Sequence, residues 1–256
     1  MQLQGKTALI AGAGRNNGRV IALNFAREGA DLILVARKMS DELNQVAKEC
    51  AALGVKTLPL LADLSTYEGA QRSVQQGLEH FGKVDVLVSV AGLRPHKDFW
   101  KYDYAEWDQV FAVNVHSTFY LAKALAPGMM ERKAGSIVAL GGRASLTSEP
   151  IGAAVVASKH ALYGLIKSLA LELGPYGIRA NLIALSNIQN KRLNPEWYAD
   201  RVGEEVTNTM GGDPDTSPLG RTGTPQEVAN VALFLASDAS SYVTGDRIIC
   251  AGGKVM

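Results

Sequence analysis

The chain has 256 residues, a formal net charge of +1 and 47% hydrophobic residues, which suits one large domain with a sizeable core. Near-neutral charge gives no reason to expect nucleic acid or an anionic membrane as a partner. The two cysteines, Cys50 and Cys250, are too few for a disulfide framework and are typical of a reducing compartment. The first residues lead directly into a strand pattern without a signal peptide, and no apolar run is long enough for a membrane span. We therefore expect a soluble, cytoplasmic protein.

Short apolar runs rich in β-branched residues alternate with helix-length segments along the whole chain. This rhythm predicts right-handed strand–helix–strand crossovers, and therefore a single-domain Rossmann-type α/β fold over residues 1–256, with a doubly wound, seven-stranded parallel sheet flanked by helices. The predicted strands are Thr7–Ala11, Asp31–Val35, Val55–Leu61, Val84–Val90, Ser136–Leu140, Arg179–Ala184 and Arg247–Cys250. The predicted helices are Gly18–Glu28, Ser40–Ala52, Thr66–Phe81, Tyr104–Met130, Ile151–Leu173 and Pro225–Ala236.

A glycine-rich turn joins the first predicted strand to the first predicted helix. Gly12 and Gly18 would let the backbone approach a pyrophosphate closely, with Arg15 and Asn16 between them. The helix N-terminus that follows would offer unpaired N–H groups and a partial positive charge. The position of the turn, after a strand and opening a helix, favours a dinucleotide site. A plain tight turn is the alternative.

The end of the second predicted strand bears on the choice of cofactor. An acidic residue there would bind the adenosine ribose hydroxyls, but this chain has Ala36 followed by Arg37 and Lys38. Arg15 adds a second guanidinium from the glycine turn. Two guanidiniums favour a 2′-phosphate, so the sequence favours NADP over NAD if a dinucleotide binds at all. The alternatives are that Arg37 and Lys38 form a solvated edge, or that the chain binds no cofactor.

The segment from Asn187 to Arg221 interrupts the alternation of strands and helices. It contains Trp197, Tyr198, three prolines and a Gly–Gly pair. A loop this long within a compact domain is usually functional or disordered. Because it follows a predicted strand at the sheet edge where ligands bind in such folds, we predict a substrate-covering lid over residues 187–221. A purely structural insertion is the alternative.

Further motifs occur in a fixed order along the chain. They are Ala62–Asp63–Leu64, Ser89–Val90–Ala91–Gly92, Val113–Asn114–Val115, Val155–Val156–Ala157–Ser158–Lys159, Pro218–Leu219–Gly220–Arg221, Pro225–Gln226–Glu227–Val228–Ala229, Phe234–Leu235–Ala236–Ser237–Asp238 and Val243–Thr244–Gly245. Together with the glycine turn, in which Asn16 replaces the middle glycine, they give the chain a close resemblance to the short-chain dehydrogenase/reductase family. The resemblance implies that Asp63 contacts adenine and that Ala91 and Gly92 line the cofactor site. It is specific for fold and leaves activity open.

The resemblance also locates the catalytic positions. Family members transfer hydride with a Tyr that exchanges a proton with the substrate oxygen, a Lys that lowers the pKa of that Tyr and holds the nicotinamide ribose, a Ser and an Asn. With 28 residues from Asn114 to the Ser position and 13 more to the Tyr position, these fall on Gly142 and Val155. Neither can donate a proton, so Asn114 and Lys159 are retained remnants. General acid–base assistance is worth about 10²- to 10⁴-fold, so little conventional turnover is expected.

Two more departures fall on the nicotinamide half of the site implied by the resemblance. Ser89 replaces the first Asn of the family's Asn-Asn-Ala-Gly segment, and Leu185–Ser186 replaces a Pro–Gly pair. The better-kept half is therefore the adenine half. Lys159 is expected either to hold a ribose hydroxyl or to survive as a relic paired with Asn114 through water or with a backbone carbonyl.

Few side chains could replace the missing phenol. Tyr163 lies eight residues after Val155 on the same predicted helix, about 12 Å along its axis, which is too far. His96, in the loop after the fourth predicted strand, is the best-placed general acid, although a surface loop histidine is the simpler interpretation. Arg94 and Arg143 could face a carboxylate or a CoA phosphate, or could be surface charges.

The segments Tyr104–Met130 and Ile151–Leu173 carry broad apolar faces. The resemblance implies that they pair across a two-fold axis, and that the last strand with its preceding helix makes a second contact, giving a tetramer. Preserved assembly surfaces beside an eroded catalytic centre predict a non-catalytic subunit of a heterotetramer. Its partner would be a homologous catalytic subunit, and the complex an NAD(P)-dependent alcohol dehydrogenase of 3-hydroxyacyl-CoA type. We expect no metal site.

Two other hypotheses stay open. The chain could be a self-sufficient enzyme in which His96 or a bound water moves the proton, or in which the reaction needs no hydride. It could instead be a nucleotide- or ligand-sensing binding protein whose 187–221 loop responds to the ligand. The tetramer could also be homomeric.

Overall fold

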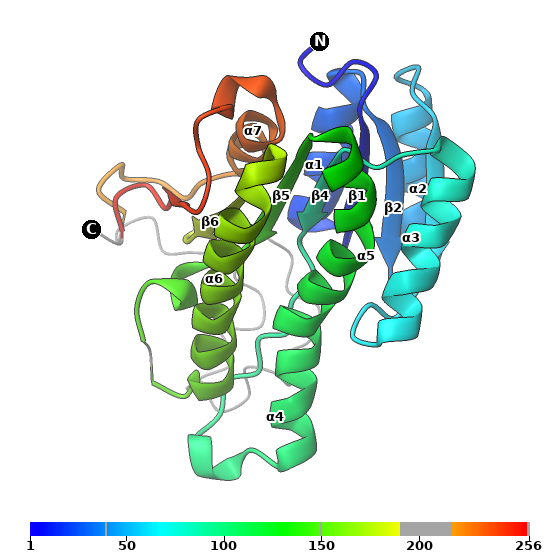
Figure 1. Cartoon of the computed structure of the whole chain (residues 1–256). Helices are drawn as coiled ribbons and strands as arrows, with labels where there is room; N and C mark the ends of the chain where they lie inside the picture. The colour runs from blue at the N-terminus through cyan, green and yellow to red at the C-terminus, as the bar shows by residue number, and fades with distance from the viewer. Residues whose placement is uncertain (39, 149, 190–216, 255–256) are drawn as a thin grey trace.

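A computed structural model describes residues 1–38, 40–148, 150–189 and 217–254. In these ranges seven parallel strands form one sheet in the order β3-β2-β1-β4-β5-β6-β7 (Figure 1). Strands are added on one side of β1 up to β3 and on its other side from β4 onward, so the switch point lies between β1 and β4. This is the predicted doubly wound Rossmann-like sheet. The strands are β1 Thr7–Ala11, β2 Asp31–Ala36, β3 Thr57–Leu61, β4 Val86–Ser89, β5 Gly135–Leu140, β6 Ile178–Leu185 and β7 Arg247–Cys250. The main helices are α1 Asn16–Arg27, α2 Ser40–Ala51, α3 Tyr67–Phe81, α4 Tyr104–Phe111, α5 Ser117–Arg132, α6 Ala153–Leu173 and α7 Pro225–Ala236.

Most predicted bounds move by no more than two residues. The strand predicted to begin at Val55 begins at Thr57, because pairing with β2 starts there. The strand predicted to begin at Val84 begins at Val86, the first residue that pairs with β1. The ends of the predicted helices also shift by one or two residues, because terminal turns fray and their assignment is the least certain part of a helix.

Alternate strand residues enter two separate cores because successive side chains point to opposite faces of a sheet. Ile10 and Leu34 pack with α1, α2 and α7 on one face. Leu9 and Ile33 pack with α3, α5 and α6 on the other. Both faces of the sheet are therefore covered, which leaves its edges for binding and assembly.

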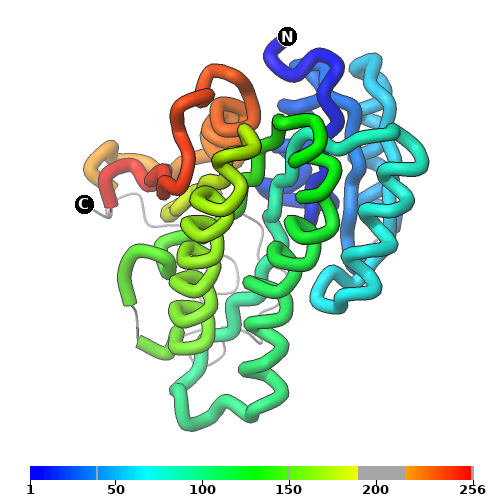
Figure 2. Tube along the Cα trace, viewed as in Figure 1, coloured from blue at the N-terminus to red at the C-terminus, as the bar shows by residue number. Residues whose placement is uncertain are grey.

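The predicted helix Tyr104–Met130 is not one regular α-helix. It divides into α4, a π-helical turn at Ala112–His116, and α5, although the chain trace runs through all three as a continuous rod (Figure 2). A π-turn adds one residue to a helical turn and frequently marks a functional position. Here it contains Asn114, which is buried.

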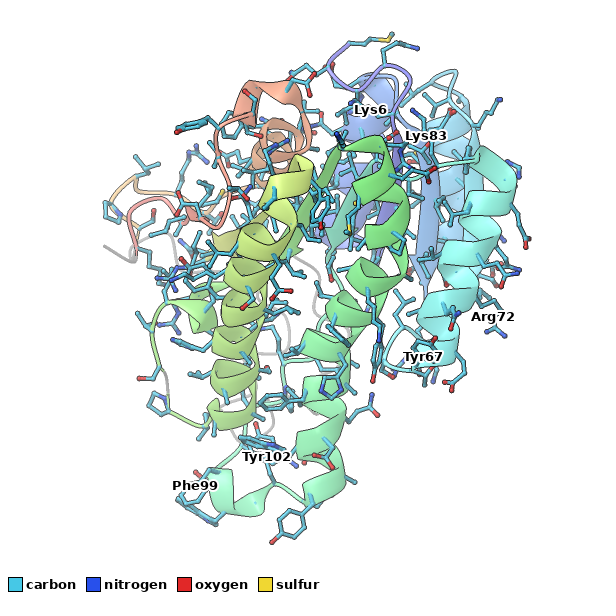
Figure 3. All side chains as sticks on the ribbon, viewed as in Figure 1. Lys6, Tyr67, Arg72, Lys83, Phe99 and Tyr102 are labelled. Carbon is cyan, nitrogen blue, oxygen red and sulfur yellow. The ribbon has the colours of Figure 1, made fainter. Side chains whose placement is uncertain are left out.

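The two ends of the sheet differ in chemistry. At the amino end, Asp85 accepts from the Thr7 backbone N–H at 2.9 Å and pairs with Lys83 at 3.1 Å, while Lys83 also donates to the Gly5 carbonyl. Phe99 and Tyr102 lie at the opposite end of the molecule (Figure 3). Local ionic contacts and hydrogen bonds therefore stabilise the amino end of the sheet. In open α/β sheets ligands bind at the other end, beyond the carboxyl ends of the strands. None of the helices within the described ranges is long and apolar enough to cross a membrane.

Gly18→Ala should destabilise the protein, because a Cβ at position 18 would overlap the Gly12 carbonyl oxygen. Overpacking of this kind costs about 1–3 kcal/mol. Gly164→Ala is the control, because position 164 is exposed within α6 and a Cβ there meets nothing within 4 Å. Alanine has the higher helix propensity, so this variant should have a free energy of unfolding about 0.5–1 kcal/mol larger than that of the wild type. Denaturant unfolding of both variants measures the difference, and equal stabilities would contradict this account of the turn.

Candidate active site and dinucleotide cleft

The glycine-rich turn brings backbone into contact with backbone at the switch point of the sheet. Gly12 has φ +92°, and a Cβ on it would lie 3.0 Å from the Ala91 nitrogen at the end of β4. Ala91 donates to the Ala11 carbonyl at 3.0 Å. Asn16 has φ +49°, a left-handed conformation that asparagine tolerates better than most residues. The replacement of the family's glycine by Asn16 therefore preserves the turn.

The N-terminus of α1 is chemically different from those of the other well-defined helices. The N-caps of α3, α4 and α7 are Thr66, Asp103 and Thr224, and each accepts from a backbone N–H of its own helix. Arg15, the N-cap of α1, makes no side-chain cap bond, and the first turn of α1 has no acidic residue. A helix N-terminus without a side-chain cap or an acidic side chain suits an anion, such as the pyrophosphate of a dinucleotide.

The adenosine side of the cleft presents mostly exposed groups. Arg15 and Arg37 are both exposed, and Ala36 leaves no carboxylate at the end of β2. Asp63 is half-buried, and its Oδ1 accepts from the Ser65 N–H at 3.0 Å and from the Ser65 hydroxyl at 2.6 Å. The position of Asp63 is therefore fixed by Ser65, with Oδ2 left for another donor.

Asn114 ties three segments of the site together. Its Oδ1 accepts from the Leu93 N–H at 2.7 Å, and its Nδ2 donates to the Leu93 carbonyl at 3.0 Å and to the Ser158 hydroxyl at 2.9 Å. Ser158 is fully buried and in turn donates to the Val155 carbonyl at 3.0 Å. The role of Ser158 was not predicted. The available signal was a small polar residue beside Lys159 in an otherwise apolar helix.

Lys159 lies in the same cluster and is almost completely buried, with 5% of its surface exposed. Its ammonium donates to the Leu140 carbonyl at the end of β5 at 2.8 Å. A Cβ on Gly92 would lie 3.6 Å from Nζ and 3.4 Å from Asn114 Oδ1, so Gly92 keeps this space open. Burial, with a smaller contribution from the nearby Arg94 charge, lowers the pKa of Lys159 from 10.5 to about 7.

The two positions without a proton donor are Gly142, whose backbone is specific to glycine, and the buried Val155. Gly142 has φ +79° and ψ 175°, a region of the Ramachandran map that is essentially restricted to glycine. Its carbonyl accepts from the Ser145 N–H and hydroxyl, at 3.0 and 2.7 Å. Val155 has no exposed surface and packs as part of the first turn of α6. Neither residue can take part in proton transfer.

The structure describes the surroundings of the other candidate proton donors. The Tyr163 ring lies against the Arg247 guanidinium, 4.5 Å from its centroid, rather than beside Val155. His96 is 3% exposed and its Nδ1 lies 2.9 Å from the Arg94 carbonyl, so it is a buried, hydrogen-bonded residue and not the surface histidine that the simpler interpretation expected. Arg94 is exposed and Arg143 is half-buried.

Ser89 replaces a family asparagine but still makes a buried polar contact. Its hydroxyl lies 2.7 Å from the Thr118 hydroxyl, which joins β4 to α5. Both residues are nearly inaccessible to water. The contact therefore attaches α5 to the sheet at this point.

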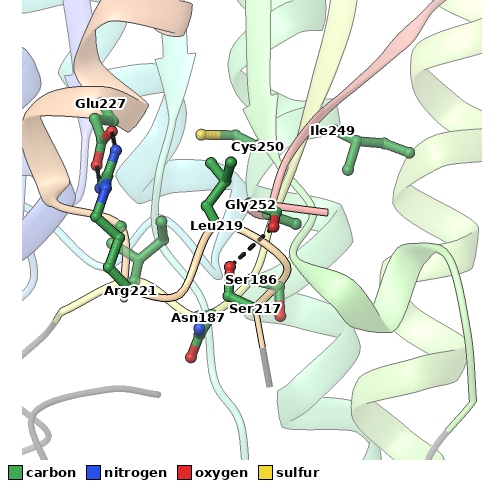
Figure 4. A pocket seen from close by; sticks show the side chains of 12 residues that line it. Ser186, Asn187, Ser217, Leu219, Arg221, Glu227, Ile249, Cys250 and Gly252 are labelled. Carbon is green, nitrogen blue, oxygen red and sulfur yellow. Dashed lines mark hydrogen bonds and ion pairs between the residues drawn. The ribbon is translucent and has the colours of Figure 1, made fainter. Parts of the chain in front are cut away.

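A pocket of about 200 Å³ lies where β6 and β7 end beside the N-terminus of α7 (Figure 4). Arg221 binds Glu227 through two contacts, at 3.0 and 2.6 Å, and these hydrogen bonds lower the pKa of Glu227 to about 2. Ser217 donates to the Gly252 carbonyl at 2.9 Å. These contacts fix the end of the predicted lid; its residues 190–216 lie outside the described ranges.

In the described part of the chain, no group of His, Cys, Asp or Glu side chains could hold a metal ion. The cleft combines the glycine-rich turn with the hydrogen-bonded pair Asn114–Ser158 and the neighbouring Lys159, which is bonded to the Leu140 carbonyl. A model of the family described as enoyl-(acyl carrier protein) reductase matches residues 12–254. The chain belongs to the short-chain dehydrogenase/reductase family.

Individual relatives agree over nearly full length. The chain is 32% identical over 252 residues to an L-rhamnose 1-dehydrogenase (NAD(P)(+)) from Sphingomonas sp. (strain SKA58), covering 98% of this chain and 96% of the relative. It is 34% identical over 257 residues to the 3-oxoacyl-(acyl-carrier-protein) reductase FabG of Thermotoga maritima, covering 100% of both. A 7α-hydroxysteroid dehydrogenase solved with NADH and 7-oxo glycochenodeoxycholic acid superposes with a TM-score of 0.88 at 31% identity, over 99% of this chain and 96% of the other. The family's oxidoreductase scaffold is therefore present throughout.

Lys159→Met should change the pH dependence of stability. Between about pH 7 and 10.5 the unfolded chain binds a proton at Lys159 that the folded chain does not, so wild-type stability rises with pH in this window. The free energy of unfolding of Lys159→Met minus that of the wild type should therefore fall as pH rises, by up to about 1.4 kcal/mol per pH unit. Lys167→Met, exposed on the same helix, controls for loss of a lysine. A constant difference for Lys159→Met would contradict the assignment.

Proposed function

We propose that this chain is a non-catalytic subunit of a hetero-oligomeric, NAD(P)-dependent alcohol dehydrogenase of 3-hydroxyacyl-CoA type. The observation that carries the proposal is the fully buried Val155 at the position where the family's tyrosine exchanges a proton with substrate. A developing alkoxide needs a donor of matched pKa beside it, and an aliphatic side chain supplies none.

The surrounding scaffold supports a retained structural role. Asn114 holds Leu93 and Ser158, and Lys159 is fixed to the Leu140 carbonyl, so the buried network persists without the phenol that it would serve. A buried polar network is costly to keep unless every member is satisfied. Its persistence is what we expect where the fold and its assembly, rather than turnover, are under selection.

The same subunit can be proposed to hold a dinucleotide. Of the relatives named above, the L-rhamnose 1-dehydrogenase has NAD(P)(+) in its name and the 7α-hydroxysteroid dehydrogenase was solved with NADH. The N-terminus of α1, which has no side-chain cap, suits a pyrophosphate. When bound, a nicotinamide cofactor accepts or supplies hydride. Arg15 and Arg37 would attract a 2′-phosphate, which favours NADP, while Asp63 and Gly92 would border the two ends of the site.

Exposed apolar side chains support assembly with a homologous subunit. Trp107 and Phe119 are exposed along the α4–α5 rod, and Phe234, Tyr242 and Ile249 are exposed beside the β7 edge. An unpaired sheet edge with apolar neighbours needs a cover in solution. The arrangement resembles the non-catalytic subunit of the heterotetrameric dehydrogenase that acts on hydroxy(phenyl)methylsuccinyl-CoA in anaerobic toluene degradation.

The chain purified alone should show no alcohol or ketone turnover at a rate usual for the family. Purification from its native host should recover a second family member that carries the Ser and Tyr. The measurements are mass spectrometry of the complex and spectrophotometric assay of NAD(P)H with each subunit separately and together. A homo-oligomer with robust turnover would rule out the proposal.

Restoring the missing side chains should not by itself restore activity. In Gly142→Ser the new side chain must occupy a glycine-specific backbone conformation, at a cost of about 1–3 kcal/mol, or the loop must rearrange. We therefore expect Gly142→Ser/Val155→Tyr to be less stable than Val155→Tyr and to remain inactive. Val155→Phe controls for the volume of the ring. Recovery of family-level turnover in the double variant would show that the loop conformation is not a barrier.

A self-sufficient oxidoreductase is the second candidate, and the buried Lys159 is the observation that favours it. A lysine with a pKa near 7 beside Gly92 and Asn114 has the proton affinity of a general acid at neutral pH. The assay of the lone chain separates the two functions: any turnover that disappears in Lys159→Met belongs to this second candidate.

A further inference from the structure

Asn17, in the first turn of α1, is a buried polar residue that the rest of the fold does not use. Only 8% of its surface is exposed, and its Oδ1 is inaccessible and has no hydrogen-bond partner among the described residues. Buried side-chain polar atoms almost always have a partner, and leaving one unsatisfied costs free energy. An orphaned acceptor at the N-terminus of an uncapped helix therefore indicates a donor that is present when the site is loaded.

The direction of the Asn17 side chain follows from its neighbour two turns along α1. Asn24 donates from Nδ2 to the Ala229 carbonyl of α7 at 3.2 Å. Seven residues are close to two helical turns, so Asn17 faces the same way, about 10 Å nearer to the carboxyl edge of the sheet. Helices α1 and α7 pack against each other and both run against the strands. Asn17 thus faces the segment just before α7, where Gly223 pairs with Ile188.

This location corresponds to one particular end of the cleft. Arg37 and Asp63 follow β2 and β3, on one side of the glycine turn. Strand order places β4, β5 and β6 on the other side, and the segment at Ile188 directly follows β6. A dinucleotide whose adenosine lies over β2 and β3 extends toward β6 from its pyrophosphate. Asn17 is therefore on the nicotinamide side of the turn.

We propose that Asn17 determines specificity for the nicotinamide carboxamide, with its Oδ1 accepting a hydrogen bond from the carboxamide N–H. This inference rests on dinucleotide binding as proposed above and is independent of whether the chain turns over substrate. A carboxamide is the group on that end of the cofactor that carries an N–H donor, and Oδ1 is an acceptor. The proposal predicts selection at the nicotinamide ring by a chain that lacks the catalytic tyrosine.

Analogues of the cofactor isolate this single hydrogen bond. In 3-acetylpyridine adenine dinucleotide a methyl ketone replaces the carboxamide and removes the N–H donor, whereas thionicotinamide adenine dinucleotide keeps it. By calorimetry, the wild-type chain should bind NAD and the thionicotinamide analogue alike and the acetylpyridine analogue about tenfold more weakly, as expected when a buried acceptor loses its donor. The phosphorylated forms are used if NADP binds more tightly.

Variants of α1 separate recognition from packing. Asn17→Leu should bind NAD and the acetylpyridine analogue equally, and should bind ADP-ribose, which lacks the ring, as the wild type does. Asn24→Leu is the matched control: it is equally buried on the same helix face and should lower stability while keeping the tenfold discrimination.

Several outcomes would overturn the proposal. Equal affinity of the wild type for NAD and the acetylpyridine analogue would show that Asn17 Oδ1 accepts no hydrogen bond from the carboxamide and binds a structural water instead. Binding of ADP-ribose without NAD would mean that the ring is excluded, and binding of neither would mean that the cleft holds no dinucleotide. None of these results would restore a proton donor at position 155, so the proposed function would stand or fall separately on its own assay.

Discussion

The carboxamide of Asn114 is the interaction on which the arrangement of this site depends. Three hydrogen bonds from one buried side chain join the loop after β4, the π-turn between α4 and α5, and the first turns of α6. An unsatisfied amide at this depth would be expensive, so the three segments are held in one geometry. The Lys159 ammonium donates to the Leu140 carbonyl, and it lies beside Gly92 and close to the space next to the Asn114 oxygen.

That geometry does not depend on the side chains at positions 142 and 155. The side chains that build the cleft are bound to backbone and to one another, and none of these bonds passes through position 142 or through the side chain of position 155. A glycine at 142 can adopt a conformation closed to other residues, and a valine at 155 can pack completely.

Electrostatics divide the cleft in two. On the turn side, α1 presents its positive N-terminal end, with no acidic side chain in its first turn and no side-chain cap bond. On the far side, burial, with a smaller contribution from the Arg94 charge, lowers the pKa of Lys159 from 10.5 to about 7. A ligand with a central pyrophosphate and a nearly neutral distal group matches this distribution better than one charged at both ends.

The sequence by itself determined the fold class with its seven parallel strands, the glycine turn and the absence of a proton donor at 142 and 155, since these follow from local periodicity and from motifs at fixed spacing. Tertiary structure alone decided the π-turn that interrupts the helix predicted from Tyr104 to Met130, the burial of His96, and the pairing of Ser158 with Asn114. Each of these depends on contacts between segments distant in the chain, and a hydrophobic pattern records that a face is buried without recording which polar group will meet it there. The Asn17 carboxamide illustrates the limit. The sequence shows an asparagine in the turn, but only the structure shows that its Oδ1 has no hydrogen-bond partner among the described residues.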